Sequence, residues 1–264
     1  IPEFTYNLYD GISPGAKIYN TSILPKNLSY KLSPKLGLRS NALVGSAAID
    51  YRHFFNTEDE AAFSMRFGTN FSRFSYDFDL FFRRTSGFFS LIYRDNDYLR
   101  DNKRHILSLR TVSINRDRNL SAAVDEPDFN VVNLQYGFSN KNLDRYVTAF
   151  ANYEVAQKFS KFSFTASYRK LFENNRQVNL RFFGGFFLYN DSQDSDFFSF
   201  ALDRPTDYLF DYNYYGRSED SGALSQQFIF AEGGFKSQLQ PAFANQWMTT
   251  VNASTTIWNW IFAY

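Results

Sequence analysis

The stretch SRFSYDFDLFF, residues 72–82, carries an apolar or aromatic side chain at every second position. These alternating positions are Phe74, Tyr76, Phe78, Leu80 and Phe82. Between them lie Ser75, Asp77, Asp79 and Phe81, with Arg73 and Arg83 towards the two ends. Side chains of a β-strand alternate between its two faces, so the pattern predicts one aromatic face and one largely charged face. The fold then depends on whether a protein core or lipid covers the aromatic face.

The composition favours lipid on that face. The 264 residues include 32 Phe and 18 Tyr, yet the mean hydropathy is polar at −0.40. Soluble cores consist mainly of Leu, Ile, Val and Ala, with aromatic residues in the minority. The net charge is +1 and no basic stripe is present, so the sequence gives no argument for nucleic acid as a partner.

Alternation recurs along the chain, for example over residues 63–71, 132–138 and 162–168. Many of these segments have about 9–12 residues, which is close to the ~9–11 that a tilted strand needs to cross a bilayer. Short turns at 139–142 and 173–176 contrast with long polar connections, which is typical of outer-membrane barrels. We therefore predict an all-β fold, an antiparallel transmembrane (outer-membrane) β-barrel. It would be a single domain over residues 1–264, with about 12–16 strands when complete.

Two other architectures are weaker. A secreted soluble β-sandwich also alternates, but predicts shorter strands, more Gly and Pro in turns and a core richer in Val, Ile and Leu. Residues 237–264 carry no charge and are long enough for a transmembrane helix. However, residues 247–264 are rich in Thr, Ser, Asn and aromatic residues, which favours a strand.

The barrel interpretation assigns two sets of residues by their expected position. The lumen-facing candidates, expected to pair with one another across strands, are Arg66, Arg73, Asp77, Asp79 and Arg83. The candidates for the membrane–water interface, where amphipathic rings gather, are Tyr189, Trp247, Trp258, Trp260 and Tyr264. A lumen lined by such charges could conduct solute or be plugged.

Signals for catalysis are weak, and we predict no catalytic, cofactor-binding or metal-binding residue in this chain. There is no cysteine, and His53 and His105 are too few for a three-histidine zinc site. The sequence GISPG at 11–15 matches G-x-S-x-G, but its Pro14 has no N–H to serve as the oxyanion donor. A barrel-embedded lipid hydrolase that uses one histidine and a serine of a neighbouring strand is the enzymatic alternative.

The stretches YRKLFENNRQVNLRFFGGFFLYND (168–191) and EGGFKSQLQPAFANQWMTTVNASTTIWNW (232–260) resemble a known family. That family is the carboxy-terminal outer-membrane barrel region of Bacteroidota gluzincin-type (aminopeptidase-like) metallopeptidases. The resemblance implies a zinc peptidase domain, with H-E-x-x-H and a downstream Glu, upstream of the barrel. Nothing here matches those residues, so the resemblance assigns zinc to an upstream domain and no catalytic role to this chain.

The expected function is an outer-membrane β-barrel that anchors a peptidase-like module, serves as a subunit of an outer-membrane protein assembly, or does both. Its expected location is the bacterial outer membrane, and its partners are outer-membrane lipid and other envelope proteins. The alternatives are a pore or channel, or an accessory scaffold of a secretion or barrel-insertion machine.

Overall fold

The structure, a computed structural model, describes residues 1–20, 26–55, 62–95, 102–118, 128–192, 195–211, 231–235 and 237–256. Strands dominate it, as the alternation predicted. They are β1 (Pro2–Asn7), β2 (Gly11–Ala16), β3 (Ile18–Tyr19), β4 (Leu28–Gly37), β5 (Ala42–Phe55), β6 (Ala62–Asp77), β7 (Leu80–Arg94), β8 (Lys103–Arg116), β9 (Asp128–Lys141), β10 (Arg145–Ala156), β11 (Phe159–Leu171), β12 (Gln177–Asn190), β13 (Phe200–Ala201), β14 (Phe243–Ala244) and β15 (Trp247–Thr255). One 3-10 turn, η1 (Asp196–Phe198), precedes β13.

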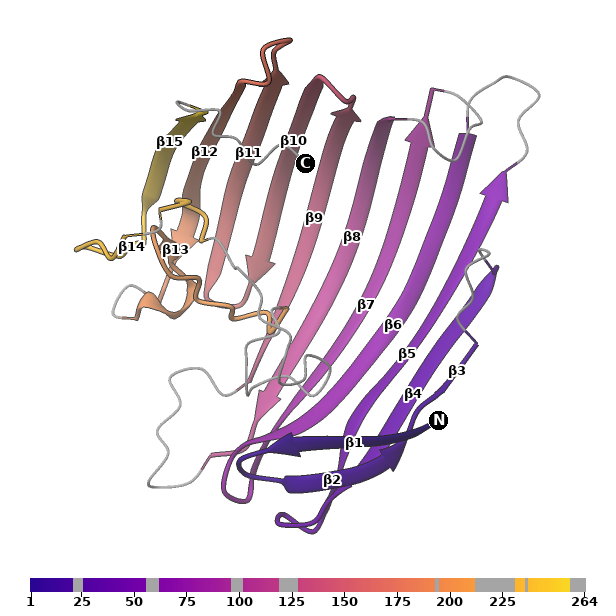
Figure 1. Ribbon diagram of the computed structural model, residues 1–264. Coiled ribbons are helices and arrows are strands. Elements are labelled where there is room, and N and C mark those ends of the chain that lie inside the picture. Colours follow the sequence, from indigo (N-terminus) through magenta and orange to yellow (C-terminus); the bar gives the residue numbers. More distant parts are fainter. Residues whose placement is uncertain are drawn as a thin grey trace.

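A single antiparallel sheet of 13 strands contains all the long strands, side by side and strongly twisted (Figure 1). Its order follows the chain from β1 and β2 through β4 to β12 and ends with β15, while β3 pairs with β4 and β13 pairs with β14 in a separate small ribbon. Among the described residues, β1 and β15 each pair on one side, so the described sheet has two free edges. The predicted all-β antiparallel fold is confirmed, but closure into a barrel is not seen in this part of the chain.

The two faces of the sheet differ in character. We call one the apolar face, because exposed aromatic and aliphatic side chains follow one another across it from β4 to β15. They include Tyr30, Ile49, Phe67, Phe89, Leu109, Leu134, Tyr153, Phe182, Phe186, Trp247 and Val251. The opposite side, the polar face, carries Arg66, Ser90, Arg110, Gln135, Asn152 and Ser163 at the alternate positions. No layer covers the apolar face in the part of the chain that the structure describes.

A segment from the carboxy-terminal third lies over one end of the polar face. We call residues 195–211 the covering segment; Figure 1 shows it with β13 in front of the long strands. It supplies Phe198, Tyr208 and Leu209 to a core completed by Val112, Ile114, Phe129, Val131, Ala156 and Phe159 of the sheet. The ring of Phe200 packs so closely on Gly185 that a Cβ there would lie 2.7 Å from it. Glycine at 185 therefore lets this segment approach the sheet.

The stretch at 72–82 does not form one strand, as the sequence suggested, but the end of a hairpin. β6 ends at Asp77, Asp79 takes a left-handed φ of 56° in the turn, and β7 begins at Leu80. Phe74 and Phe82 pair across this hairpin on the polar face, where the ring of Phe82 stacks on Phe210 of the covering segment. The prediction of a single strand was wrong, because the apolar residues recur at every second position through the turn as well as in the two strands that it joins.

The β1–β2 hairpin lies across the same end of the sheet (Figure 1), and polar contacts attach it to β6. The pairing of β6 with β7 shifts register between Ser75 and Asp77. Asn7 donates to the carbonyl of Ser75 at 3.0 Å, and Asp10 accepts from the Ser75 N–H at 3.2 Å. Asp10 is fully buried and also accepts from the hydroxyl of Ser40 at 2.7 Å. The hairpin therefore supplies partners for backbone groups at the irregularity.

Candidate functional site

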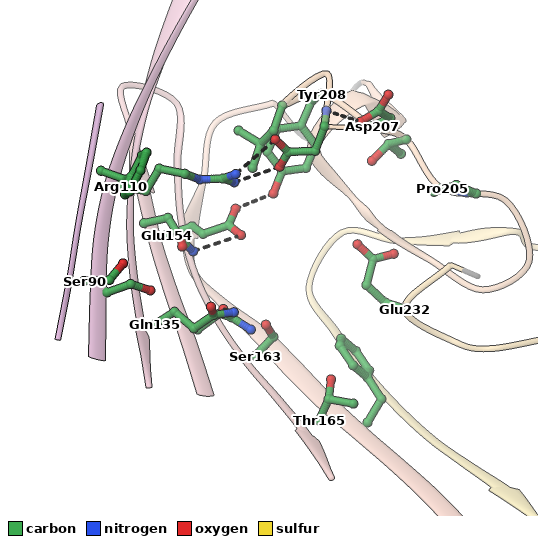
Figure 2. Close-up of a pocket in the computed structure, with 18 residues that line it drawn as sticks. Ser90, Arg110, Gln135, Glu154, Ser163, Thr165, Pro205, Asp207, Tyr208 and Glu232 are labelled. Atoms are coloured by element: carbon green, nitrogen blue, oxygen red, sulfur yellow. Dashed lines mark hydrogen bonds and ion pairs between the residues drawn. The ribbon is translucent and has the colours of Figure 1, made fainter. Parts of the chain in front are cut away.

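A cavity of about 500 Å³ lies between the polar face and the covering segment. Figure 2 shows Ser90, Gln135, Ser163 and Thr165 on the sheet side, with Tyr208 and Asp207 on the loop opposite them. Phe88, Phe183 and Tyr208 supply aromatic surface to its lining. Its volume falls within the range of about 300–1,000 Å³ that is usual for small-molecule sites.

The floor of the cavity is a row of uncharged polar side chains, which we call the neutral row. The strand register pairs Ser90 with Ser108, Ser108 with Gln135, Gln135 with Asn152, and Asn152 with Ser163. The neutral row therefore takes one residue from each of β7, β8, β9, β10 and β11. Within it, the Gln135 amide donates to the Asn152 carbonyl oxygen at 2.7 Å.

A second row, closer to the covering segment, contains charges. The register aligns Phe88, Arg110, Asn133, Glu154 and Lys161 across β7 to β11. The Glu154 carboxylate accepts from the Tyr208 hydroxyl, and also from the Asn133 amide at 3.4 Å. This row joins the sheet to the covering segment through hydrogen bonds at the cavity wall.

Two arginines hold the end of the covering segment through ion pairs with Asp211. Asp211 accepts from Arg84 at 2.6 Å and from Arg110 at 3.0 Å. Arg84 also donates to the carbonyl of Leu209 at 2.8 Å. Two cations on neighbouring strands and one carboxylate thus fix where the segment crosses β7 and β8.

Lys161 lies beneath the covering segment with its charge enclosed by aromatic rings. Its ammonium is 4.5 Å from the ring centroid of Tyr208 and 5.0 Å from that of Phe200. It donates to the carbonyl of Phe198 at 2.9 Å. Its side chain is not part of the cavity lining, so it acts here as an anchor for the segment.

The phenol of Tyr208, in the covering segment, is kept neutral by its surroundings. Burial raises the pKa of its phenol well above the ordinary value, and the neighbouring charge of Glu154 raises it further. Both effects oppose a second negative charge at this position. The neutral phenol is therefore kept as a donor to the Glu154 carboxylate.

The five predicted lumen residues are divided by the structure. Arg66 lies on the polar face and pairs with Asp50. Arg73 and Arg83 pair with each other across β6 and β7. Arg73 is two residues from Phe71 on β6 and so shares its face, which places both arginines on the apolar face instead. Asp77 is the last residue of β6, and Asp79 lies in the turn that leads into β7. The expected common face fails because the register of the hairpin puts positions 66 and 73 on opposite sides.

Arg73 and Arg83 mark one end of the apolar face. The Arg73 guanidinium lies 4.4 Å from the ring centroid of Phe81, and Arg83 binds Asp117 at 3.0 Å. At this same end of the sheet lie two predicted interface residues: Tyr189, next to the last residue of β12, and the exposed Trp247, the first residue of β15. Trp258, Trp260 and Tyr264 lie outside the described residues.

Both histidines lie on the apolar face among aromatic rings. His53 packs edge-on against Phe55, and the His105 ring pairs with the Tyr136 hydroxyl at 2.8 Å. Among the described residues, no histidine is hydrogen-bonded to a serine, and no group of three or more metal-ligating side chains is assembled. No helix in the described part of the chain is long and apolar enough to cross a membrane.

Comparisons with protein families, with curated proteins and with solved structures found no match.

The cavity residues were missed by the sequence analysis. Gln135 and Ser163 are polar positions of the alternating segments 132–138 and 162–168, but nothing in the sequence distinguishes them from the other polar positions there. The signal that assembles them is the register of five adjacent strands, together with a loop more than forty residues further on. Which polar residues of neighbouring strands lie side by side can be known only from the strand register, and the sequence pattern does not give that register.

Proposed function

We propose that this chain is the membrane wall of a bacterial outer-membrane β-barrel and that it anchors an attached module to that membrane. The observation that carries the proposal is the apolar face, where large side chains such as Phe67, Phe89 and Val251 stay exposed across the sheet. Such a surface is unfavourable in water when nothing covers it, whereas lipid tails would bury it. The strands β5 to β12 have 12–16 residues each, enough for tilted strands to cross a bilayer.

The polar face supports an anchor over an open pore. The covering segment is fixed to it by Lys161, Arg84 and Arg110, which fills part of the space that a conducting lumen would need. We expect the reconstituted protein to stay electrically silent in planar bilayers.

Lipid exposure is tested by tryptophan fluorescence with a matched pair of variants. In a background with Trp247→Phe, Trp258→Phe and Trp260→Phe, one variant adds Phe89→Trp on the apolar face and the other adds Phe88→Trp on the polar face. In vesicles whose acyl chains carry bromine, the tryptophan at 89 should be quenched strongly and the one at 88 weakly, because only the first would contact lipid. Equal quenching of the two variants, or failure to associate with vesicles, would refute the proposal.

The resemblance to the metallopeptidase barrel region makes a zinc peptidase the proposed module. The native polypeptide should then have a mass well above the 30.8 kDa of this chain and carry about one zinc ion. Intact mass under denaturing conditions and metal analysis of the folded sample measure both quantities. A native mass near 30.8 kDa without zinc would reject the proposal of a peptidase module. The proposal that the chain forms a membrane wall would then depend on the fluorescence test.

A further inference from the structure

The cavity under the covering segment combines three properties: neutral hydrogen-bonding groups, aromatic walls and charges that are already engaged. We propose that it is a binding site for a neutral saccharide of one or two rings, free or at the end of a glycan. This inference goes beyond anchoring, and it does not depend on the chain being in a bilayer.

The first argument concerns the charged side chains of the lining. Four carboxylates line the cavity, and each accepts at least one hydrogen bond. Glu154 accepts from Tyr208 and Asn133, and Asp211 accepts from Arg84 and Arg110. Asp207 accepts from the N–H of Asp211 at 2.9 Å, and Glu232 accepts from the N–H of Ala201 at 3.0 Å. Arg110, the cation of the lining, is held by Asp211 at 2.8 Å. A charged ligand would have to compete with these contacts, which favours an uncharged one.

The second argument concerns the neutral row. Among the described residues, the hydroxyls of Ser90, Ser108 and Ser163 have no hydrogen-bond partner, and neither does the amide nitrogen of Asn152. Hydroxyl groups both donate and accept, and a side-chain amide nitrogen donates twice. Saccharide hydroxyls also donate and accept, so a row of such groups at strand spacing offers them several matched partners.

The third argument concerns shape and aromatic surface. Phe88 lines the cavity from β7, the first strand of the neutral row, and Phe183 lines it from β12, the strand after the last one of the row. Tyr208 lies across from the sheet (Figure 2). The C–H face of a sugar ring packs on aromatic rings while its hydroxyls meet polar groups. A volume of about 500 Å³ accommodates one or two sugar rings.

The test is isothermal titration calorimetry of the full chain in lauryldimethylamine oxide micelles, a detergent without a sugar headgroup. The probes are maltose and N,N′-diacetylchitobiose, with spermidine as the cationic probe. We expect saturable binding of at least one disaccharide and none of spermidine. Asn152→Leu should weaken the disaccharide by about tenfold or more, because it removes hydrogen-bonding groups that face the ligand.

The matched control is Asn70→Leu, an amide on the polar face that lies outside the cavity lining, and its affinity should equal that of the unaltered chain. Because leucine at 152 could disturb the sheet, the double variant Ser108→Ala, Ser163→Ala provides a second reading, removing only two hydroxyls and also weakening binding. Absence of saturable heat with both disaccharides would overturn the proposal. Binding of spermidine instead, abolished by Glu154→Gln, would overturn it in favour of a cation site.

Discussion

At the level of single residues, Tyr208 links protonation to the attachment of the covering segment. Its hydroxyl donates to Glu154, its ring lies 4.5 Å from the ammonium of Lys161, and the side chain is 6 % exposed. One tyrosine therefore satisfies a carboxylate and shields a lysine at the same time. Loss of its proton would place a second anion beside Glu154 in a buried site.

The stability of the folded chain should fall at high pH because of this group. The pKa of Tyr208 is raised in the folded state, so the unfolded chain releases the proton first, near pH ~10. The phenol therefore contributes its full stabilisation below about pH 10 and loses it as the pH rises towards the folded-state pKa.

Thermal unfolding followed by circular dichroism between about pH 8 and pH 11 measures this loss. Tyr208→Phe should lower the midpoint at pH 8, since Glu154 loses a donor at a cost of about 1–3 kcal/mol. It should also flatten the fall above about pH 10. Tyr30→Phe, at an exposed tyrosine, should change neither property. A Tyr208→Phe curve parallel to that of the unaltered chain would contradict the assignment.

At the level of elements, each long strand presents different chemistry along its length. On the apolar face of β8, Leu109 is exposed in the middle of the strand and Ser113 is exposed towards the end that carries Asn115. Arg83 donates to Asn115 at 2.7 Å, so polar contacts begin where the apolar side chains stop. If lipid covers this face, the hydrocarbon layer would therefore end between Leu109 and Ser113 of β8.

Arginine placed at these two positions of β8 should have unequal costs. In a bilayer, Leu109→Arg should lower the free energy of unfolding by about 2–4 kcal/mol, and Ser113→Arg by about 0–1 kcal/mol, because the penalty depends on depth. Denaturant titration in lipid vesicles gives both values. Equal costs at 109 and 113 would mean that the apolar face has no depth profile and that lipid does not cover it.

The polar face of the same strands also changes along its length, and this explains the main error of the sequence analysis. Near the covering segment, Val112 and Ile114 of β8 and Phe129 and Val131 of β9 point to the polar face and are buried. Apolar residues are needed there because the covering segment forms a local core. In β6 the apolar positions accordingly change from Phe71 on one face to Phe74 on the other.

At the level of the whole molecule, the periodicity of the sequence correctly predicted an antiparallel all-β structure with long strands. The turn at 173–176 was also correct, since β11 ends at Leu171 and β12 begins at Gln177. Alternation is a local property, so it identifies strands well. The common placement of Arg66 with Arg73 and the composition of the cavity depend on register and on contacts distant in sequence, which alternation does not encode.

The uncovered apolar face has a consequence for how the sequence can vary. Residues beneath the covering segment, such as Phe159 and Phe183, must fit neighbours on every side, so a change of shape there is costly. Side chains such as Leu134 and Val251 project into no matching surface within the described structure. Leucine, phenylalanine, valine and tyrosine should therefore replace one another there at little cost. Selection on the apolar face would preserve only hydrophobicity, whereas beneath the covering segment it would preserve the identity of each residue.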